Sequence, residues 1–326
     1  MKALITGSNG FIGSHLVERL LNHGYQVKCL VRKTSNLRWI DQLLIEIAYG
    51  DITDLDSLLP QVAGVDYVFH LSGALRAKDE SDFFRINQGG TKNILEACRL
   101  QNSNLKRFVY ISTQAAAGPA TNGIPLKEDD PPNPISIYGK SKQLAEQSVL
   151  EFRKYFPTTI IRPPAVYGPR DDDFMEVFKY IKLGFKPLIG KKEKFISIIH
   201  IDDLVRGIHI AAEHLNAENQ IFFISNREGC SWIELEDMIA RVMGKKALKI
   251  VLPELALDVA AFISEKTAKI FNKTAILNRD KANEMKQNFW LIDASKAERE
   301  LNFIAEIPLE NGLNETYQWY RNQGWL

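Results

Sequence analysis

Tyr138 and Lys142 stand four positions apart in the stretch Tyr-Gly-Lys-Ser-Lys, within a helix predicted over residues 138–154. Side chains at this spacing share one helix face. A phenol with its ordinary pKa of about 10 is a poor acid or base near neutrality, but a nearby cation favours the phenolate and lowers that pKa. The pair could therefore exchange a proton with a substrate oxygen. The spacing alone is weak evidence, because Tyr and Lys share helix surfaces by chance.

Two further hydroxyl groups, on Ser112 and Thr113, come at the end of a strand predicted over residues 107–112. Open parallel α/β sheets bind their ligands at the carboxyl ends of the strands. We expect Thr113 to orient the substrate oxygen, with Ser112 as the neighbouring alternative. The remaining alternative is that both hydroxyls only cap local backbone.

A glycine-rich turn, Thr-Gly-Ser-Asn-Gly-Phe-Ile-Gly over residues 6–13, follows a predicted strand and opens a predicted helix. This context makes it informative. Gly7 allows a tight turn, Gly10 lets the backbone approach a pyrophosphate, and Gly13 lets the helix pack on the strand, while the helix N-terminus presents amides to the anion. The cofactor-binding residues predicted in this turn are Gly7, Asn9, Gly10, Phe11, Ile12 and Gly13.

Arg32 and Lys33 follow the second predicted strand, where a carboxylate would ordinarily hold the cofactor ribose hydroxyls. A guanidinium suits a 2′-phosphate, so the sequence favours NADP, with NAD as the alternative. Both side chains could instead be a solvated strand end. Asp51 and Ile52 end the third strand, where the carboxylate could accept a hydrogen bond from an adenine amino group or simply belong to a turn.

Short apolar runs alternate with helical patterns in the first half of the chain, which predicts an α/β fold: a Rossmann-type doubly wound parallel sheet. Strands are predicted at residues 2–6, 26–32, 45–49, 67–71, 107–112 and 158–162, and helices at 11–22, 90–99 and 138–154. We predict an NAD(P)-binding domain over residues 1–162 and a smaller, mainly substrate-binding part over 163–326, with helices at 174–183 and 231–243. A later strand at residues 195–200 could return to the sheet, and the proline-rich residues 122–136 predict an ordered loop beside the site.

The 326 residues are 45% hydrophobic, and 41 basic residues nearly cancel 40 acidic ones. This balance predicts no nucleic-acid partner and no membrane partner, but a small-molecule substrate. Three separated cysteines and six dispersed histidines predict neither a disulfide framework nor a metal site, and favour a cytoplasmic location. Residues 255–271 predict a packed amphipathic helix, with a surface or partner contact as the alternative.

Taken together, these motifs resemble the extended short-chain dehydrogenases/reductases, also called the NAD-dependent epimerase/dehydratase family. The resemblance covers nearly the whole chain. Beyond the motifs above it is carried by His-Leu-Ser-Gly at residues 70–73, Asn87 before Gly-Thr-Lys-Asn at 90–93, Arg-Pro-Pro-Ala-Val-Tyr-Gly-Pro at 162–169 and His-Ile-Asp-Asp-Leu at 200–204. It implies that residues 71–74, including Leu71, Ser72 and Gly73, line the cofactor. It also implies that Asn87 supports the catalytic helix, that Pro163, Ala165 and Val166 touch the nicotinamide end, and, by analogy, that the protein is a homodimer.

The resemblance implies hydride transfer between nicotinamide and a substrate carbon while Tyr138 exchanges a proton with the oxygen. Members acting on nucleotide sugars commonly have Asn in place of Ala165 and an Arg shortly before residues 202–203; residues 194–199 contain no Arg, although Lys191, Lys192, Lys194 or Arg170 could substitute. We therefore favour an oxidoreductase acting on a small, apolar carbonyl or alcohol, similar to dihydroflavonol reductases and 3β-hydroxysteroid dehydrogenases. The alternatives are a nucleotide-sugar epimerase or dehydratase, and a non-catalytic regulatory protein that binds NADP.

Overall fold

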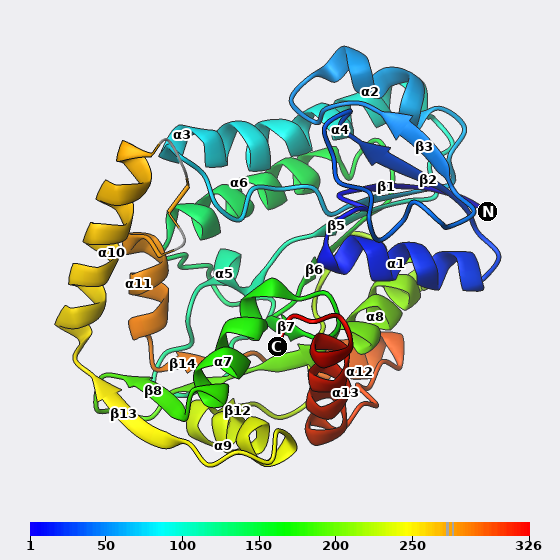
Figure 1. Cartoon of the computed structure of the whole chain (residues 1–326). Helices are drawn as coiled ribbons and strands as arrows, with labels where there is room; N and C mark the ends of the chain where they lie inside the picture. The colour runs from blue at the N-terminus through cyan, green and yellow to red at the C-terminus, as the bar shows by residue number, and fades with distance from the viewer. Residues whose placement is uncertain (272–273, 276) are drawn as a thin grey trace.

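A seven-stranded, all-parallel sheet forms the centre of the computed structural model, which describes residues 1–271, 274–275 and 277–326 (Figure 1). Its strand order is β11-β6-β5-β4-β1-β2-β3. The strands are β1 (Lys2–Thr6), β2 (Gln26–Val31), β3 (Glu46–Tyr49), β4 (Tyr67–His70), β5 (Arg107–Ile111), β6 (Thr158–Arg162) and β11 (Gln220–Phe223). The chain winds outward from β1 in both directions, so the order reverses between β1 and β4, where such sheets bind ligands at their carboxyl ends. The predicted Rossmann-type fold is confirmed.

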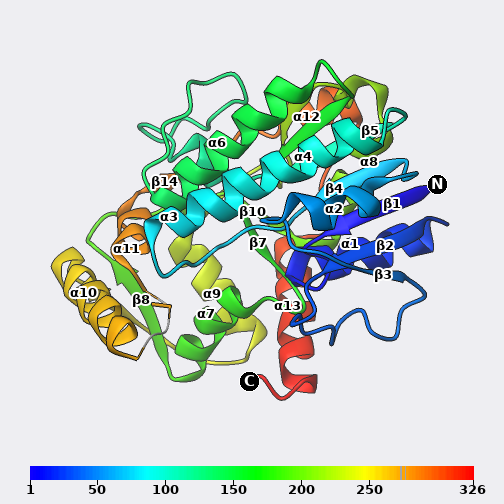
Figure 2. The same cartoon turned by 90° about the horizontal axis from the view of Figure 1, so that it is seen from above.

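Helices cover both faces of this sheet (Figures 1 and 2). One apolar core packs the sheet against α1 (Phe11–Asn22), α8 (Ile201–Glu213) and α12 (Ser295–Leu301). The other packs it against α2 (Leu55–Val62), α4 (Gly90–Gln101) and α6 (Ile137–Phe152). Every residue of β4, β5 and β6 is buried, which explains why these strands are continuous apolar runs in the sequence rather than alternating ones.

The later strand that joins the large sheet is β11, and the prediction that residues 195–200 do so is wrong. These residues instead form β9 (Phe195–Ile196) and β10 (Ile198–His200), which belong to two small sheets. Helix α8 packs on the large sheet and returns the chain so that β11 lies parallel to β6. A parallel strand requires such a crossover helix, and residues 195–200 precede it.

The smaller part of the molecule surrounds a third apolar core formed by α7 (Asp172–Lys182), α9 (Trp232–Val242) and α13 (Leu309–Asn322). The predicted helices at 174–183 and 231–243 are thereby confirmed, and Ser231 and Glu234 form a capping box that begins α9. Short strands complete this part: β7 (Ala165–Tyr167) pairs with β10, β12 (Cys230–Ser231) and β14 (Phe289–Trp290) flank β9, and β8 (Phe185–Ile189) pairs with β13 (Leu248–Leu252).

Helix α10 (Glu254–Ile270) lies on the outside of the molecule against α11 (Arg279–Lys286) (Figure 1). The helix itself is predicted correctly, but its packing is not: of the described residues of α10, Ala261 alone is buried. Its apolar positions 255, 259, 263 and 270 are exposed. Asp258 and Glu265 instead face α11, where they pair with Lys286 and Arg279.

Candidate active site

The glycine turn joins β1 to α1 at the centre of the carboxyl edge of the sheet. Gly7 has a φ of 70°, and a Cβ there would lie 2.9 Å from the backbone nitrogen of Ser72. A Cβ on Gly13 would lie 2.1 Å from the carbonyl oxygen of Gly7, so only glycine lets α1 approach the turn this closely. By contrast, a Cβ on Gly10 would lie no closer than 3.4 Å to any described atom considered, which leaves room for a ligand at this position.

The N-terminus of α1 is chemically suited to an anion. Among the described residues no side chain caps Gly10, and the first turn contains no acidic residue, so the amides at this end keep their capacity to bind phosphate oxygens. Asn9 donates from Nδ2 to the carbonyl oxygen of Asn36 at 3.1 Å, which ties the turn to the chain after β2. Phe11 and Ile12 are half-buried against the core of that face.

Arg32 and Lys33 are exposed just beyond the end of β2. On the neighbouring strand end, Asp51 Oδ1 accepts hydrogen bonds from the backbone nitrogen and hydroxyl of Thr53 at 2.9 and 2.8 Å. Burial by itself would raise the pKa of Asp51, but these hydrogen bonds and the charge of Arg32 lower that pKa overall. The two predicted ribose and adenine contacts therefore lie close enough to interact, and Ile52 is buried beside them.

A chain of buried hydrogen bonds connects β1 to the loop after β4. Thr6 Oγ1 lies 2.7 Å from His70 Nδ1, and His70 Nε2 lies 3.0 Å from Thr91 Oγ1. Since Thr91 donates its proton to the carbonyl oxygen of Asn87 at 2.6 Å, it must accept from His70 Nε2, which fixes the histidine tautomer. Thr6 Oγ1 also accepts from the backbone nitrogen of Ser72 at 3.1 Å.

Asn87 lies in a π-helical turn, Phe84–Gly89, that precedes α4, and it links the predicted cofactor loop to the predicted catalytic helix. Its Oδ1 accepts from the backbone nitrogen of Ala74 at 2.7 Å, and its Nδ2 donates to Ser141 Oγ on α6 at 2.8 Å. A Cβ on Gly73 would meet the same Asn87 Oδ1 at 3.0 Å. Asn87 thus bridges the two segments, and its support of a catalytic helix stays a prediction.

Because His70 is buried, we expect the folded protein to lose stability in acid. Burial lowers the pKa of His70 from 6.5 to about 3, so below pH 6.5 the unfolded chain binds a proton that the folded chain does not. We expect this residue to reduce the free energy of unfolding as the pH falls from 6.5 towards 3, by at most about 1 kcal/mol per pH unit. Urea unfolding of the wild type and of His70→Asn between pH 6.5 and 3 measures this dependence. If the free energy of unfolding fell equally steeply with pH in both proteins, the prediction would be contradicted.

Helix α6 places Tyr138 and Lys142 beside the ends of β4 and β5. Lys142 is buried, and its Nζ donates to the carbonyl oxygen of Ile111 at 2.8 Å and lies 4.3 Å from the ring centroid of Tyr110. Burial lowers the pKa of Lys142 to about 7. A Cβ on Gly73 would lie 3.9 Å from Lys142 Nζ, so Lys142 adjoins the loop that the resemblance assigns to the cofactor.

The pKa of Tyr138 is raised rather than lowered, which is opposite to the expectation from the sequence. Burial is the main cause, the carboxylate of Glu284 adds to it, and an interaction with Thr113 acts in the other direction. The physical reason is that burial disfavours the charged phenolate and that the negative charge of Glu284, from a distant part of the chain, disfavours it further. Phe83 packs edge-on against the Tyr138 ring.

Thr113 and Ser112 differ in their hydrogen bonding. Thr113 caps the short helix α5 (Gln114–Ala117), and its Oγ1 accepts from the backbone nitrogen of Ala115 at 3.2 Å. The same hydroxyl interacts with Tyr138, where it acts to lower the pKa of the phenol. Ser112 is buried, and its Oγ has no hydrogen-bond partner among the described residues. Both hydroxyls therefore have unused capacity beside the predicted catalytic tyrosine.

Helix α11 contributes residues that the sequence analysis missed. Ser136 caps α6 through Gly139 and donates from Oγ to Glu284 Oε1 at 2.7 Å. The backbone nitrogen of Ile137 donates to Asp280 Oδ2 at 2.6 Å. Two carboxylates thus hold the positive end of the helix that carries Tyr138. Asp280 and Glu284 are more than 140 positions in the chain from the residues that they contact, and nothing in their local sequence marks them.

Two of the four cations that could substitute for a diphosphate-binding arginine are engaged within the protein. Arg170 donates to Glu18 Oε1 at 2.6 Å and to Ser14 Oγ at 3.0 Å, both on α1. Lys194 donates to the carbonyl oxygens of Lys286 and Gln287 at 2.8 and 3.2 Å. Lys191 and Lys192 remain exposed in the loop after β8.

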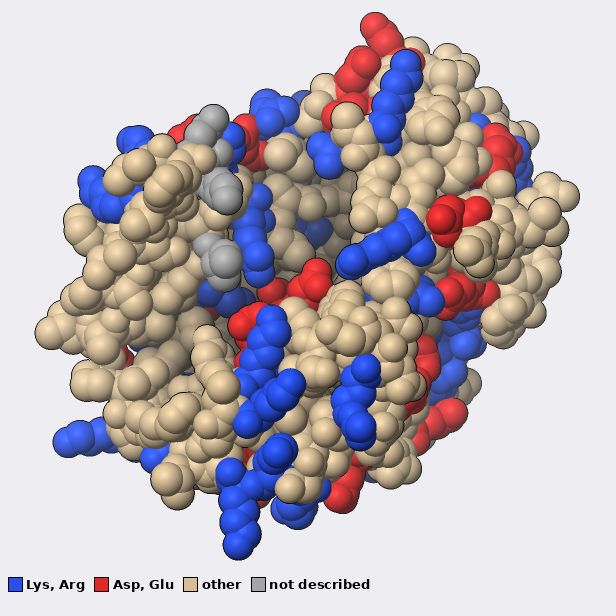
Figure 3. Space-filling model, in the orientation of Figure 1, with Lys and Arg blue, Asp and Glu red and all other residues tan. Residues whose placement is uncertain are grey.

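The predicted nicotinamide-end residues follow β6. The carbonyl oxygen of Pro163 accepts from the backbone nitrogen of Gln114 at 2.8 Å, so this segment lies beside Thr113. Ala165 is exposed and Val166 is half-buried against the core. The molecule is hollowed between α6, α7 and the α10–α11 pair, with both basic and acidic side chains around the rim (Figure 3).

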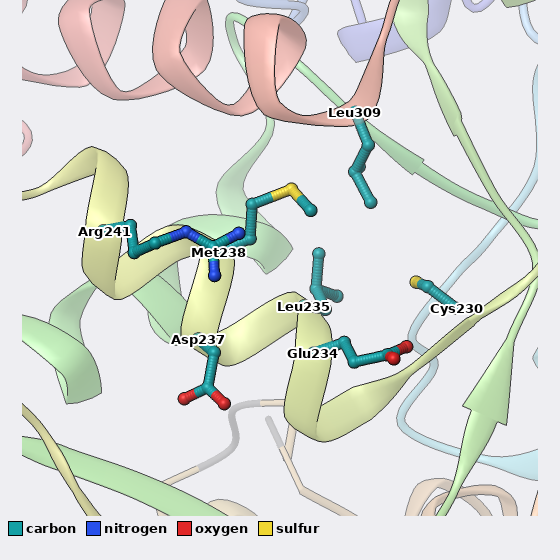
Figure 4. A pocket seen from close by; sticks show the side chains of 7 residues that line it. All are labelled: Cys230, Glu234, Leu235, Asp237, Met238, Arg241 and Leu309. Atoms are coloured by element: carbon teal, nitrogen blue, oxygen red, sulfur yellow. The ribbon is translucent and has the colours of Figure 1, made fainter.

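A separate pocket of about 330 Å³ lies between α9 and the start of α13 (Figure 4). The side chains that line it are Cys230, Glu234, Leu235, Asp237, Met238, Arg241 and Leu309. It includes none of the residues predicted to bind cofactor or substrate, so it is not the site described above.

Comparison with known proteins places these motifs in a wider group. Residues 3–225 match the profile of the NAD dependent epimerase/dehydratase family. The ceramide reductase of Caulobacter vibrioides is 28% identical over 99% of this chain and 95% of its own length. A 3 beta-hydroxysteroid dehydrogenase/Delta 5→4-isomerase of Mycobacterium tuberculosis is 31% identical over 75% of this chain and 70% of its own. The UDP-glucose 4-epimerase of Thermotoga maritima, at 24% identity and a TM-score of 0.81 over 99% of each chain, shares the fold.

Proposed function

This chain belongs to the NAD-dependent epimerase/dehydratase family, and from that premise we propose that it is an NADP-dependent reductase or dehydrogenase of an apolar carbonyl or alcohol. The observation that carries the choice is the engagement of Arg170 by α1 and of Lys194 by the end of α11. Neither of these two cations is free to bind the diphosphate of a nucleotide sugar, which leaves Lys191 and Lys192 of the four candidates. Ala165 also offers no polar group to such a substrate.

The glycine turn, the uncapped N-terminus of α1 and the loop around Gly73 fit a dinucleotide. The nicotinamide, when bound, supplies or accepts the hydride. Lys142 holds the ribose beside Gly73, and Asn87 links this loop to α6 through its hydrogen bonds to Ala74 and Ser141. Leu71, Ser72, Pro163 and Val166 complete the wall of this half of the site.

Tyr138 donates the proton to the substrate oxygen in the reductive direction. Burial and the Glu284 carboxylate raise its pKa, so the phenol keeps its proton through neutral and moderately alkaline pH. The Thr113 hydroxyl orients the same oxygen, and the neighbouring Ser112 hydroxyl is the second candidate donor to it. In its protonated form the phenol can act as the general acid for carbonyl reduction.

The relatives support an apolar substrate class. The two relatives above are named for ceramide and for a 3β-hydroxysteroid. Both of these molecules are largely hydrocarbon. The solved structure named for UDP-glucose is 24% identical to this chain, so its similarity supports the fold alone. A substrate of this class needs burial of apolar surface rather than cations, which agrees with the internal use of Arg170 and Lys194.

Calorimetric titration of the protein with NADPH, NADH, UDP and a UDP-sugar tests the proposal, followed by NADPH oxidation with a panel of apolar ketones. We expect binding of NADPH, no heat from UDP or the UDP-sugar, and turnover of at least one ketone. Binding of UDP with conversion of the UDP-sugar would overturn the assignment in favour of an epimerase or dehydratase.

The NADP assignment rests on Arg32 and predicts a selective effect of its removal. We expect Arg32→Ala to weaken NADPH binding about tenfold or more and NADH binding little, because only the 2′-phosphate forms a charge-assisted contact with the guanidinium. Calorimetry with both cofactors measures the two changes on one variant, so NADH serves as the internal control. Equal losses for the two cofactors would remove the assignment.

A further inference from the structure

One flank of the molecule exposes apolar side chains on β13 and α10. It is defined here as the apolar flank and comprises Leu248, Leu252, Leu255, Val259, Ile263 and Ile270. Leu248, Leu255 and Ile270 are 76%, 72% and 77% exposed. Exposed large apolar residues are ordinary when scattered singly, but a contiguous group calls for a physical explanation.

The fold itself turns these residues outward. Leu255, Val259 and Ile263 are four positions apart, and Ile270 follows seven later, so they share one face of α10. The opposite face contains Ala261 and the two acidic residues that pair with α11. A surface helix ordinarily buries its apolar stripe. Likewise, β13 is parallel to β8 with all five of its residues exposed, whereas parallel strands are ordinarily covered.

The charges around the apolar flank are mainly positive. Between residues 245 and 269 the chain has five lysines and three acidic residues. Two of those acidic residues, Asp258 and Glu265, are neutralised by Lys286 and Arg279. In the described part of the chain, Lys249, Lys266 and Lys269 form no ion pair. Figure 3 shows the side of the molecule over α10 as mostly uncharged, with basic side chains near its edges.

Apolar side chains bordered by unpaired lysines match the boundary between headgroups and acyl chains of an anionic bilayer. A buried protein interface would instead require the lysines to find carboxylates or lose their solvation. No helix in the described part of the chain is long and apolar enough to cross a membrane, so the contact would be superficial. This proposal departs from the prediction of no membrane partner, which rested on the overall charge balance, because docking depends on local charge.

Helix α10, which carries most of the apolar flank, packs through its opposite face on α11, a helix of the candidate active site. There Asp280 accepts a hydrogen bond from the backbone nitrogen of Ile137, the residue before Tyr138. We propose that the apolar flank docks on the surface of an anionic lipid bilayer and that the enzyme takes its substrate from that bilayer. The second half of this statement rests on the proposed reductase function, whereas the docking does not.

Co-sedimentation of the full chain with vesicles tests the docking. We expect binding to phosphatidylcholine vesicles that contain phosphatidylglycerol and weaker binding to pure phosphatidylcholine. At about 1 M salt, where charges are screened within roughly 3 Å, binding to the anionic vesicles should fall to the level of pure phosphatidylcholine. Ile263→Asp should lower the partition coefficient about tenfold or more, and Lys266→Glu with Lys269→Glu should lower it on anionic vesicles only. Leu44→Asp, at a residue that is 93% exposed outside the flank, is the matched control and should change nothing.

Two measurements on Ile263→Asp separate the docking from the proposed function: NADPH binding and turnover of a water-soluble ketone. Both should equal those of the wild type. Failure of the wild type to bind anionic vesicles, or equal losses in Ile263→Asp and Leu44→Asp, would overturn the docking. Self-association abolished by Ile263→Asp, without vesicle binding, would assign the flank to a second copy of the chain and would equally overturn it.

Discussion

Tyr138→Phe is expected to lower the turnover number for carbonyl reduction by about 10²–10⁴-fold, the range supplied by a positioned general acid. The substitution removes one hydroxyl and keeps the ring that packs against Phe83. NADPH affinity should be unchanged, because the predicted cofactor contacts are on Lys142, the glycine turn and the loop around Gly73. Steady-state oxidation of NADPH and calorimetry measure the two quantities on the same variant.

Tyr155→Phe provides the matched control for this prediction. Tyr155 follows α6 and is 49% exposed, so loss of its hydroxyl should change neither turnover nor binding. Retained turnover in Tyr138→Phe would remove Tyr138 from the proton transfer. A loss of NADPH affinity equal to the loss of turnover would instead indicate that the substitution disturbs the cofactor site.

Glu146→Ala is expected to reduce the free energy of unfolding by about 3–5 kcal/mol, since it leaves a buried charge without its partner. Arg162 donates from Nε and Nη2 to the two carboxylate oxygens of Glu146 at 2.9 and 2.7 Å, and both side chains are 4% exposed. The pair joins α6 to the end of β6, immediately before Pro163. Urea unfolding monitored by circular dichroism measures the loss.

Two variants make this prediction specific. Glu151→Ala removes an exposed carboxylate from the same helix and should change stability by no more than about 0.5 kcal/mol. Replacing Glu146 and Arg162 together by Met should cost less than Glu146→Ala alone, because no unpaired charge is left buried. Equal losses in Glu146→Ala and Glu151→Ala would show that the buried pair contributes nothing particular.

The sequence by itself determined the parts of this protein whose signals are local. Strand and helix periodicity over residues 2–22 and 158–162 depends on neighbouring residues, so β1, α1 and β6 lie within a residue of the predicted bounds. The roles of Gly7 and Gly13 were also readable, because a tight turn and a close helix approach admit only glycine at fixed spacing. Motif spacing likewise indicated the family.

Tertiary structure decided what depends on residues distant in the chain. The raised pKa of Tyr138 comes from burial and from Glu284, and β11 rather than residues 195–200 joins the sheet because α8 returns the chain beside β6. Arg170 and Lys194 were open candidates for a diphosphate until their partners on α1 and α11 were known. The outward face of α10 was equally undetermined: periodicity gives a helix one apolar side, but only the packing of α11 against the other side decides which one meets solvent.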